Sequence, residues 1–287
     1  CGSCSVDMFE TYMEWDRKVL EYLGDYADYI SLHRYVGNRE DDTPDYLAVT
    51  NSIDQQIEEM DSVCRFVQAK RRSNKRAYLC FDEWNVWYKN HETDGEGKFA
   101  PHLVEEVYNL EDALVVAGFL NSFIRHADVV KIANIAQIVN VIAPILTRKD
   151  DLLIQASFYP IEMIARRRDG IALRTIVDGP SYDSKNHGSA PYIDASAILN
   201  GDKLQVFAVN RSLDEIAEVR TNLSDGAISE FESGELLTGS DPKAANSFEQ
   251  PDLITPQPFT GVNVADGNAA FEMPPLSLAA MTLQVEK

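Results

Sequence analysis

The sequence predicts an α/β segment followed by an antiparallel β-sandwich. In the first 170 residues, stretches with helical periodicity alternate with short apolar runs that are typical of buried strands. From Gly170 onward, Gly, Pro, Asn and Ser separate short strand-like runs, as is typical of antiparallel β-structure. We therefore place an α/β domain over residues 1–169 and a β-sandwich over residues 170–287.

The helices of the first segment are indicated by apolar stripes. Residues 7–23 form one stripe, which ends at Gly24. The longest stripe repeats at spacings of four and three residues, through Ile53, Ile57, Met60, Cys64 and Val67. It ends in the basic run 70–72, which suits the negative end of a helix dipole. Two more helices are expected over residues 110–124 and 157–168.

The strands of the first segment are short apolar runs between these helices, at residues 29–32, 77–81 and 129–136. Such alternation predicts a parallel sheet with right-handed crossovers. Three strands would leave open sheet edges, and a complete (β/α)8 barrel takes about 250 residues. We therefore expect strands 6–8 of a TIM barrel, with the remaining strands outside this sequence or on a partner chain.

The second segment carries a clear hairpin signal. Asn200-Gly201 separates the apolar runs 192–199 and 203–209. Apolar and polar residues then alternate over 281–285, which predicts a closing, half-buried strand.

Composition narrows the class of partner. A formal net charge of −20 repels phosphate backbones, so no nucleic-acid partner is expected, whereas an uncharged glycan is compatible with it. No apolar run approaches the ~18–20 residues that span a bilayer. The chain opens at Cys1 without a charged-then-apolar leader, which leaves an upstream start and a signal peptide open.

The four cysteines give no metal or cofactor prediction. Cys1 and Cys4 have metal-site spacing, but no second pair or nearby histidine accompanies them. Cys64 and Cys80 fall at apolar positions, where a buried thiol is the ordinary state. Free thiols weakly favour a reducing, cytoplasmic compartment.

The stretch 81–88 contains the candidate catalytic and sugar-binding residues. An apolar strand runs into Asp82 and Glu83, followed by two tryptophans and a tyrosine. The carboxyl ends of parallel strands face the active site. Indole rings cover the apolar face of a sugar, and a carboxylate can attack its anomeric carbon. Taken alone, an Asp-Glu pair is more often an ordinary exposed pair of acids.

The neighbouring strand ends supply further candidates. His33 and Tyr35 are two residues apart, so both side chains leave one face of an extended segment and could hydrogen-bond a neighbouring carboxylate. The end of the third strand supplies Asn134 and Gln137, whose amides could donate to sugar hydroxyls. The ordinary alternatives are backbone hydrogen bonds for His33 and Tyr35 and loop capping for the amides.

Several segments resemble family 51 glycoside hydrolases, the intracellular-type α-L-arabinofuranosidases. They are residues 28–35, 81–88, 110–114, 136–144 and 274–277, in the family's order. The Asp-Glu-Trp-Asn-Val-Trp run within them is the most specific. The resemblance implies a retaining hydrolase that removes terminal α-L-arabinofuranosyl residues from arabinose-containing polysaccharides or oligosaccharides, and a homo-oligomer.

The resemblance also implies roles for single residues. Glu83 corresponds to the nucleophile, and Tyr35 to the tyrosine beside it. Trp87 corresponds to an indole that contacts the sugar, and Gln137 to an amide that contacts the arabinose. His33, which shares a strand face with Tyr35, is a further candidate for substrate binding.

One departure concerns the acid/base carboxyl. The family's acid/base is a Glu that follows Asn at the end of the fourth barrel strand, and no such run occurs in this sequence. Retention needs two carboxyls about 5–5.5 Å apart. Glu40, Asp41 and Asp42 lie in a polar loop too far from the strand end. We therefore expect the acid/base outside this sequence, and residues 1–287 alone to be inactive.

Two alternative functions stay open. One is another glycosidase of the same barrel clan, a xylosidase or an endoglucanase, because the loops that set substrate choice are mostly outside the sequence. The other is a non-catalytic carbohydrate-binding or assembly module with the β-sandwich as its working part. An upstream Asn-Glu would favour the enzyme, and a native start at Cys1 the module.

Overall fold

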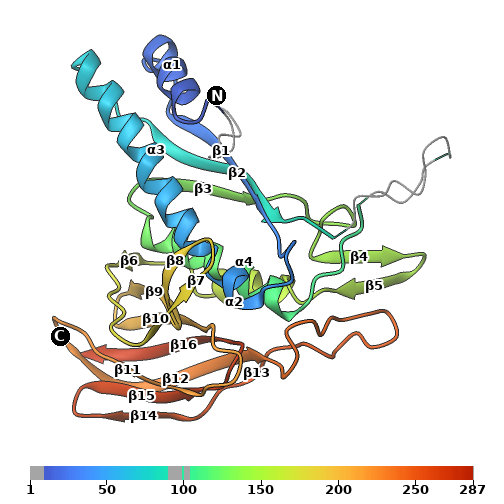
Figure 1. The fold of residues 1–287 in the computed structure, drawn as a ribbon. Coiled ribbons are helices and arrows are strands. Elements are labelled where there is room, and N and C mark those ends of the chain that lie inside the picture. The colour runs from blue at the N-terminus through green and yellow to red at the C-terminus, as the bar shows by residue number, and fades with distance from the viewer. Residues whose placement is uncertain (1–9, 90–98, 100–103, 287) are drawn as a thin grey trace.

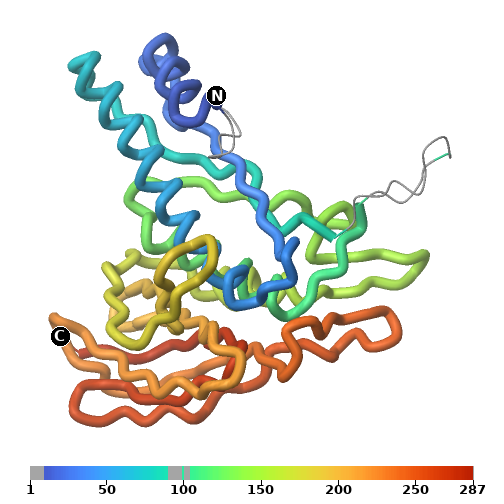
Figure 2. Tube along the Cα trace, in the orientation of Figure 1, coloured from blue at the N-terminus to red at the C-terminus, as the bar shows by residue number. Residues whose placement is uncertain are grey.

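The structure, a computed structural model, describes residues 10–89, 99 and 104–286. Parallel strands and long helices occupy one end of the molecule, and antiparallel sheets the other (Figures 1 and 2). The elements of the first part are α1 (Glu14–Leu23), β1 (Tyr29–Val36), α2 (Thr43–Leu47), α3 (Thr50–Arg71), β2 (Tyr78–Val86), α4 (Leu110–Arg125), β3 (Val130–Ile135), β4 (Ile145–Arg148), β5 (Asp151–Ile154) and α5 (Phe158–Ala165).

The second part consists of strands. They are β6 (Ile171–Leu173), β7 (Ser181–Ser184), β8 (Gly188–Pro191), β9 (Ile193–Asn200), β10 (Lys203–Asn210), β11 (Ala217–Thr221), β12 (Ala227–Thr238), β13 (Gln257–Pro258), β14 (Val262–Ala265), β15 (Asn268–Met273) and β16 (Ser277–Glu286). The proposed domain boundary after residue 169 falls between α5 and β6, and β6 pairs with β9 of the sandwich.

The predicted parallel sheet is confirmed, in the order β1-β2-β3. Helix α3 connects β1 to β2, and α4 connects β2 to β3, as a barrel segment requires. Strands β1 and β2 run further than the apolar runs predicted, to Val36 and Val86, because their ladder continues through polar residues. His33 and Tyr35 therefore lie within a strand rather than after it.

Helix α4 lies at the centre of the molecule (Figure 1). Asn109 and Asp112 form a capping box at its start, which satisfies two backbone N–H groups. Residues 110–119 are all buried, because the helix packs against α3 and β2 on one side and β9 and β10 on the other.

The sandwich contains a six-stranded sheet, in the order β13-β12-β16-β10-β9-β6, and a three-stranded sheet, in the order β11-β15-β14. The predicted hairpin is confirmed: β9 and β10 pair antiparallel, with Asn200 opposite Lys203. The two turn residues are Gly201 and Asp202, and Gly201 has a positive φ of 64°. That conformation favours glycine in a two-residue hairpin turn.

The prediction that the closing strand is half-buried was wrong. Residues 277–283 of β16 are buried without a break. The strand lies inside the six-stranded sheet, and its side chains alternate between two cores. Leu278 and Ala280 belong to the core that contains the helices, whereas Met281 and Leu283 belong to the core between the two sheets.

Two features were not expected from the sequence. The short helix α2 follows β1, with Asp42 as its N-cap, and the hairpin of β4 and β5 projects from the parallel sheet (Figure 1).

Helix α5 is also shorter than predicted and ends at Ala165, after which Arg166 and Arg167 pair with Glu235 of β12. No helix in the described part of the chain is long and apolar enough to cross a membrane.

Buried and partly buried ion pairs connect the helices to the sandwich. Arg125 of α4 pairs with Asp54 of α3 at 2.8 Å and with Asp194 of β9. Arg211 donates to the other oxygen of Asp194 at 2.8 Å, and both side chains are only 4% exposed. Removing one member would leave a buried charge uncompensated, which is costly.

Asp54 gives this network a pH dependence. Burial raises the pKa of a carboxyl, but His126 and Arg125 outweigh that effect and hold the pKa of Asp54 below its usual value. A lowered carboxyl pKa stabilises the folded state above the unfolded-state pKa, and this stabilisation is lost as the pH falls through the folded-state pKa.

We expect Asp54→Asn, made in the full-length protein that contains this chain, to lower the free energy of unfolding by about 1–2 kcal/mol at neutral pH. The difference from wild type should shrink at about pH 3, because below the unfolded-state pKa of about 4 the ionised Asp54 carboxylate contributes less to the free energy of unfolding. Urea unfolding at both pH values measures it. Asp151→Asn, at an exposed position, is the control. An equal difference at both pH values would contradict the prediction.

Candidate active site

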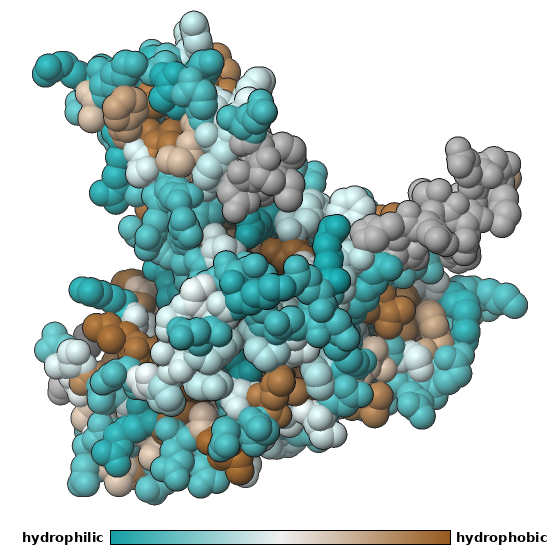
Figure 3. Space-filling model, in the orientation of Figure 1, coloured by the Kyte–Doolittle hydropathy of each residue, from teal (hydrophilic) through white to brown (hydrophobic). Residues whose placement is uncertain are grey.

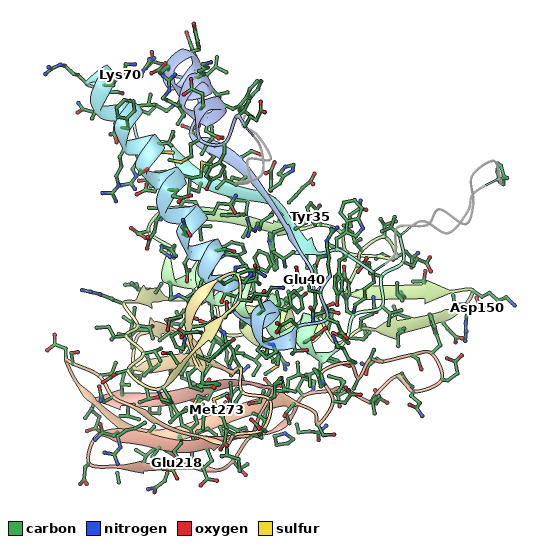
Figure 4. The ribbon with its side chains drawn as sticks, in the orientation of Figure 1. Tyr35, Glu40, Lys70, Asp150, Glu218 and Met273 are labelled. Atoms are coloured by element: carbon green, nitrogen blue, oxygen red, sulfur yellow. The ribbon has the colours of Figure 1, made fainter. Side chains whose placement is uncertain are left out.

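The carboxyl ends of β1 and β2 bring three of the predicted residues together. The Tyr35 hydroxyl donates a hydrogen bond of 3.0 Å to Glu83 Oε2. His33 Nδ1 lies 3.4 Å from the same oxygen. Figure 4 labels Tyr35 near the end of β1. The structure thus brings Glu83, Tyr35 and His33 together at one edge of the parallel sheet.

An irregularity in the sheet allows two consecutive carboxylates to meet one histidine. Leu32 pairs with Phe81, but His33 pairs with Glu83, so Asp82 has no partner on β1. In a regular strand, Asp82 and Glu83 would point to opposite faces. Instead, His33 Nε2 lies 3.4 Å from Asp82 Oδ1, which also accepts a 2.7 Å hydrogen bond from the Ser31 hydroxyl. Bulges of this kind re-aim side chains and are frequent beside active sites.

Trp87 completes the cluster. Its ring lies edge-on to the Tyr35 ring, with centroids 5.4 Å apart. Its side chain is 37% exposed, which leaves ring surface available to a ligand. Burial, followed by the adjacent Glu83 carboxylate, raises the pKa of Tyr35 above its usual value. Tyr35 therefore stays protonated at neutral pH and remains a hydrogen-bond donor.

The turn after β2 is held by residues that the sequence did not indicate. The backbone N–H groups of Tyr88 and Lys89 donate to Glu106 Oε1, at 3.0 and 2.7 Å. The Tyr108 hydroxyl donates to the Val86 carbonyl at 2.8 Å. Glu106 is fully buried, and no local motif marks it, because it comes from a polar stretch far along the chain.

Steric crowding requires a glycine at position 37, opposite this turn. A Cβ added at Gly37 would lie 2.3 Å from Tyr88 Cβ, so only glycine leaves room for the Tyr88 side chain. The loops that follow β1 and β2 therefore pack directly against each other beside Trp87.

Gln137 and Asn134 lie further from the cluster. Both side chains are exposed, Asn134 in β3 and Gln137 in the loop that follows it. Among the described residues, no hydrogen bond joins Gln137 to Glu83. Because β3 runs parallel to β2, the loop that carries Gln137 leaves the same edge of the sheet as Glu83.

The acidic residues after β1 have other partners. Glu40 pairs with Lys185, and Asp41 Oδ1 lies 2.5 Å from Lys243 Nζ. Asp42 accepts from the Asp45 backbone as the cap of α2. Figure 4 shows Glu40 in the loop that follows β1, and polar residues cover much of the face seen in Figure 3.

Within the part of the chain that the structure describes, no group of three or more His, Cys, Asp or Glu side chains could hold a metal ion. The Cys1 and Cys4 pair lies outside the described residues.

Residues 82–277 match the family described as the α-L-arabinofuranosidase C-terminal domain. A *Bacillus subtilis* protein, intracellular exo-α-(1→5)-L-arabinofuranosidase 1, is 36% identical over 99% of this chain and 57% of its own length. The *Acetivibrio thermocellus* intracellular exo-α-(1→5)-L-arabinofuranosidase is 42% identical over 75% of this chain and 44% of its own. The chain thus spans about half the length of these relatives.

Solved structures of α-L-arabinofuranosidases have folds similar to that of this chain. AbfB, a family 51 α-L-arabinofuranosidase from *Bifidobacterium longum*, superposes with a TM-score of 0.90 at 27% identity and covers 99% of this chain and 58% of its own. The α-L-arabinofuranosidase from *Thermotoga maritima*, in its arabinose complex, superposes with a TM-score of 0.79 at 25% identity, over 95% of this chain and 56% of its own.

Proposed function

The chain belongs to the family 51 α-L-arabinofuranosidases, and we propose that it carries the nucleophile of a retaining glycoside hydrolase. The proposed substrate is a terminal α-L-arabinofuranosyl residue of an arabinose-containing polysaccharide or oligosaccharide. Relatives named as exo-acting arabinofuranosidases support this substrate class, and their description as intracellular supports a cytoplasmic location.

The hydrogen bond between Tyr35 and Glu83 is the observation that carries the proposal. It fixes one carboxylate oxygen at the strand end and leaves Oε1 to act as the nucleophile. Trp87 stands beside this pair with an exposed indole, as a sugar-binding platform would. A solvated pair of acids would not need a tyrosine, a histidine and an indole around it.

The proposed reaction has two steps. In the first, Glu83 Oε1 attacks the anomeric carbon, and the glycosidic C–O bond breaks as its oxygen takes a proton from a second carboxyl. In the second, water attacks the same carbon and gives its proton to the second carboxyl, and Glu83 leaves as a carboxylate. Two inversions give net retention. We propose that the second carboxyl lies outside this sequence.

The neighbouring side chains act on Glu83 and on the sugar. Tyr35 and His33 hold the Glu83 carboxylate in one orientation. Trp87 covers an apolar face of the furanose, and the Gln137 amide donates to a sugar hydroxyl. We also propose that the remaining barrel strands come from outside this sequence, and that the enzyme is a homo-oligomer.

We expect Glu83→Gln in the full-length protein to lower kcat on an aryl α-L-arabinofuranoside by several orders of magnitude. The amide has nearly the same shape but is a poor nucleophile, so the fold should survive while the covalent route is lost. Glu162→Gln on α5, at a partly exposed glutamate away from the β1 and β2 strand ends, is the matched control. Turnover within about tenfold of wild type would rule out Glu83 as the nucleophile.

Trp87→Ala should weaken substrate binding by about 1–3 kcal/mol, seen as a raised KM, because an aromatic face against the sugar is lost. Trp15→Ala removes a comparably exposed indole from α1 and should leave KM unchanged. If Trp87→Ala behaves like Trp15→Ala, the indole is not part of the sugar site.

A further inference from the structure

Asn85 lies two residues beyond Glu83 on β2, and its side chain is fully buried. We infer that Asn85 is a positioning residue: it fixes the loop 136–142 that carries Gln137, and through this loop it sets where Gln137 meets the sugar. The inference rests on the proposed function, because it concerns a residue of the proposed arabinose site.

The Asn85 amide is completely used by neighbouring backbone. Its Nδ2 donates to the Ala136 carbonyl at 2.8 Å and to the Ile142 carbonyl at 2.6 Å. Its Oδ1 accepts from the backbone N–H of Val86 at 2.8 Å. A side-chain amide offers two donors on one nitrogen, and both are taken up by carbonyls of the same loop.

Those two carbonyls stand at the two ends of the loop. The Ala136 carbonyl belongs to the peptide that leads into Gln137, and the Gln137 backbone N–H donates to the Ile142 carbonyl at 3.3 Å. Asn85 therefore closes the base of the loop and attaches both ends to β2. A backbone hydrogen bond from Ala136 to the Trp84 carbonyl, at 3.2 Å, supports the first attachment.

The tip of the loop has little packing to hold it. Gln137 is exposed, and Ile138 and Val139 are 60% and 47% exposed. A loop that packs weakly against the core depends on its hydrogen bonds for a defined conformation. The Asn85 amide supplies two of these hydrogen bonds from the buried segment 84–86 of β2.

The chemistry of this position requires an amide. Aspartate would place a carboxylate against two carbonyl oxygens, and alanine would leave the Ala136 carbonyl without its Asn85 donor. Because Glu83 and Asn85 leave the same strand end, one short segment both supplies the proposed nucleophile and positions a proposed sugar contact from the neighbouring strand.

A double-mutant cycle in the full-length protein tests the inference. Asn85→Ala and Gln137→Ala are each expected to lower kcat/KM on an aryl α-L-arabinofuranoside by about tenfold to hundredfold, mainly through KM. The double variant should fall no more than about twofold below Asn85→Ala, because the second change removes a contact already lost. Asn85→Ser, which keeps one donor, should show the same coupling with a smaller loss and serves if Asn85→Ala does not fold.

The control separates positioning from general stability. Asn121 of α4 is also a fully buried amide, which donates to the Asp194 carbonyl at 3.3 Å and accepts from the Ser196 hydroxyl at 2.7 Å. Asn121→Ala should lower the thermal midpoint of unfolding about as much as Asn85→Ala does. Any loss in kcat/KM that it causes should simply add to the loss caused by Gln137→Ala, without coupling.

Additive losses for Asn85→Ala and Gln137→Ala, or wild-type kinetics in either single variant, would overturn the inference. Glu83→Gln tells this failure apart from failure of the proposed function. If Glu83→Gln is inactive while Asn85 and Gln137 do not couple, only the positioning role is wrong. If Glu83→Gln is active, the proposed function itself is wrong.

Discussion

The proposed site depends on the parallel pairing of β1 and β2 and on its interruption at Asp82. Parallel strands bring their carboxyl ends to one edge, so His33 and Tyr35 meet Glu83 although nearly fifty residues of chain separate them. The unpaired Asp82 shifts the ladder by one residue, which turns two consecutive carboxylates toward one histidine. Because register is set by the whole ladder of backbone hydrogen bonds, a local change in either strand would move the carboxylates relative to the donors that hold them.

The turns beyond these strands are held by buried polar side chains from distant parts of the chain. Glu106 binds the backbone after Trp87, and Asn85 binds the loop after β3. Gln155 adds a third connection, since it joins the backbone of Glu106, Tyr108 and Ala143. A buried polar group must be satisfied, so each of these side chains ties a loop to the core in one arrangement. Such support lets exposed groups such as Trp87 and Gln137 hold defined positions at the surface.

The β-sandwich packs against the helices of the α/β part and shares an apolar core with it. Its six-stranded sheet has α4 and α5 on one face and the three-stranded sheet on the other, which explains why β16 is buried on both faces. Side chains of the helix-facing side join the same apolar core as the parallel strands. Buried charges at Asp194 and Arg211 connect the sheet to α3 and α4 as well. The two parts therefore share one interface across the proposed boundary at residue 169.

The sequence alone determined the fold class, the parallel strands and most helices, because periodicity of apolar residues records which face is buried. It also pointed to Glu83, Tyr35, His33 and Trp87, since polar and aromatic residues follow apolar strands at the ends where sites form. It did not indicate the shift at Asp82, the hairpin of β4 and β5, or the roles of Asn85 and Glu106. Those were decided by tertiary structure, because strand register and the partners of buried polar groups depend on which distant segments meet, and no local pattern encodes that meeting.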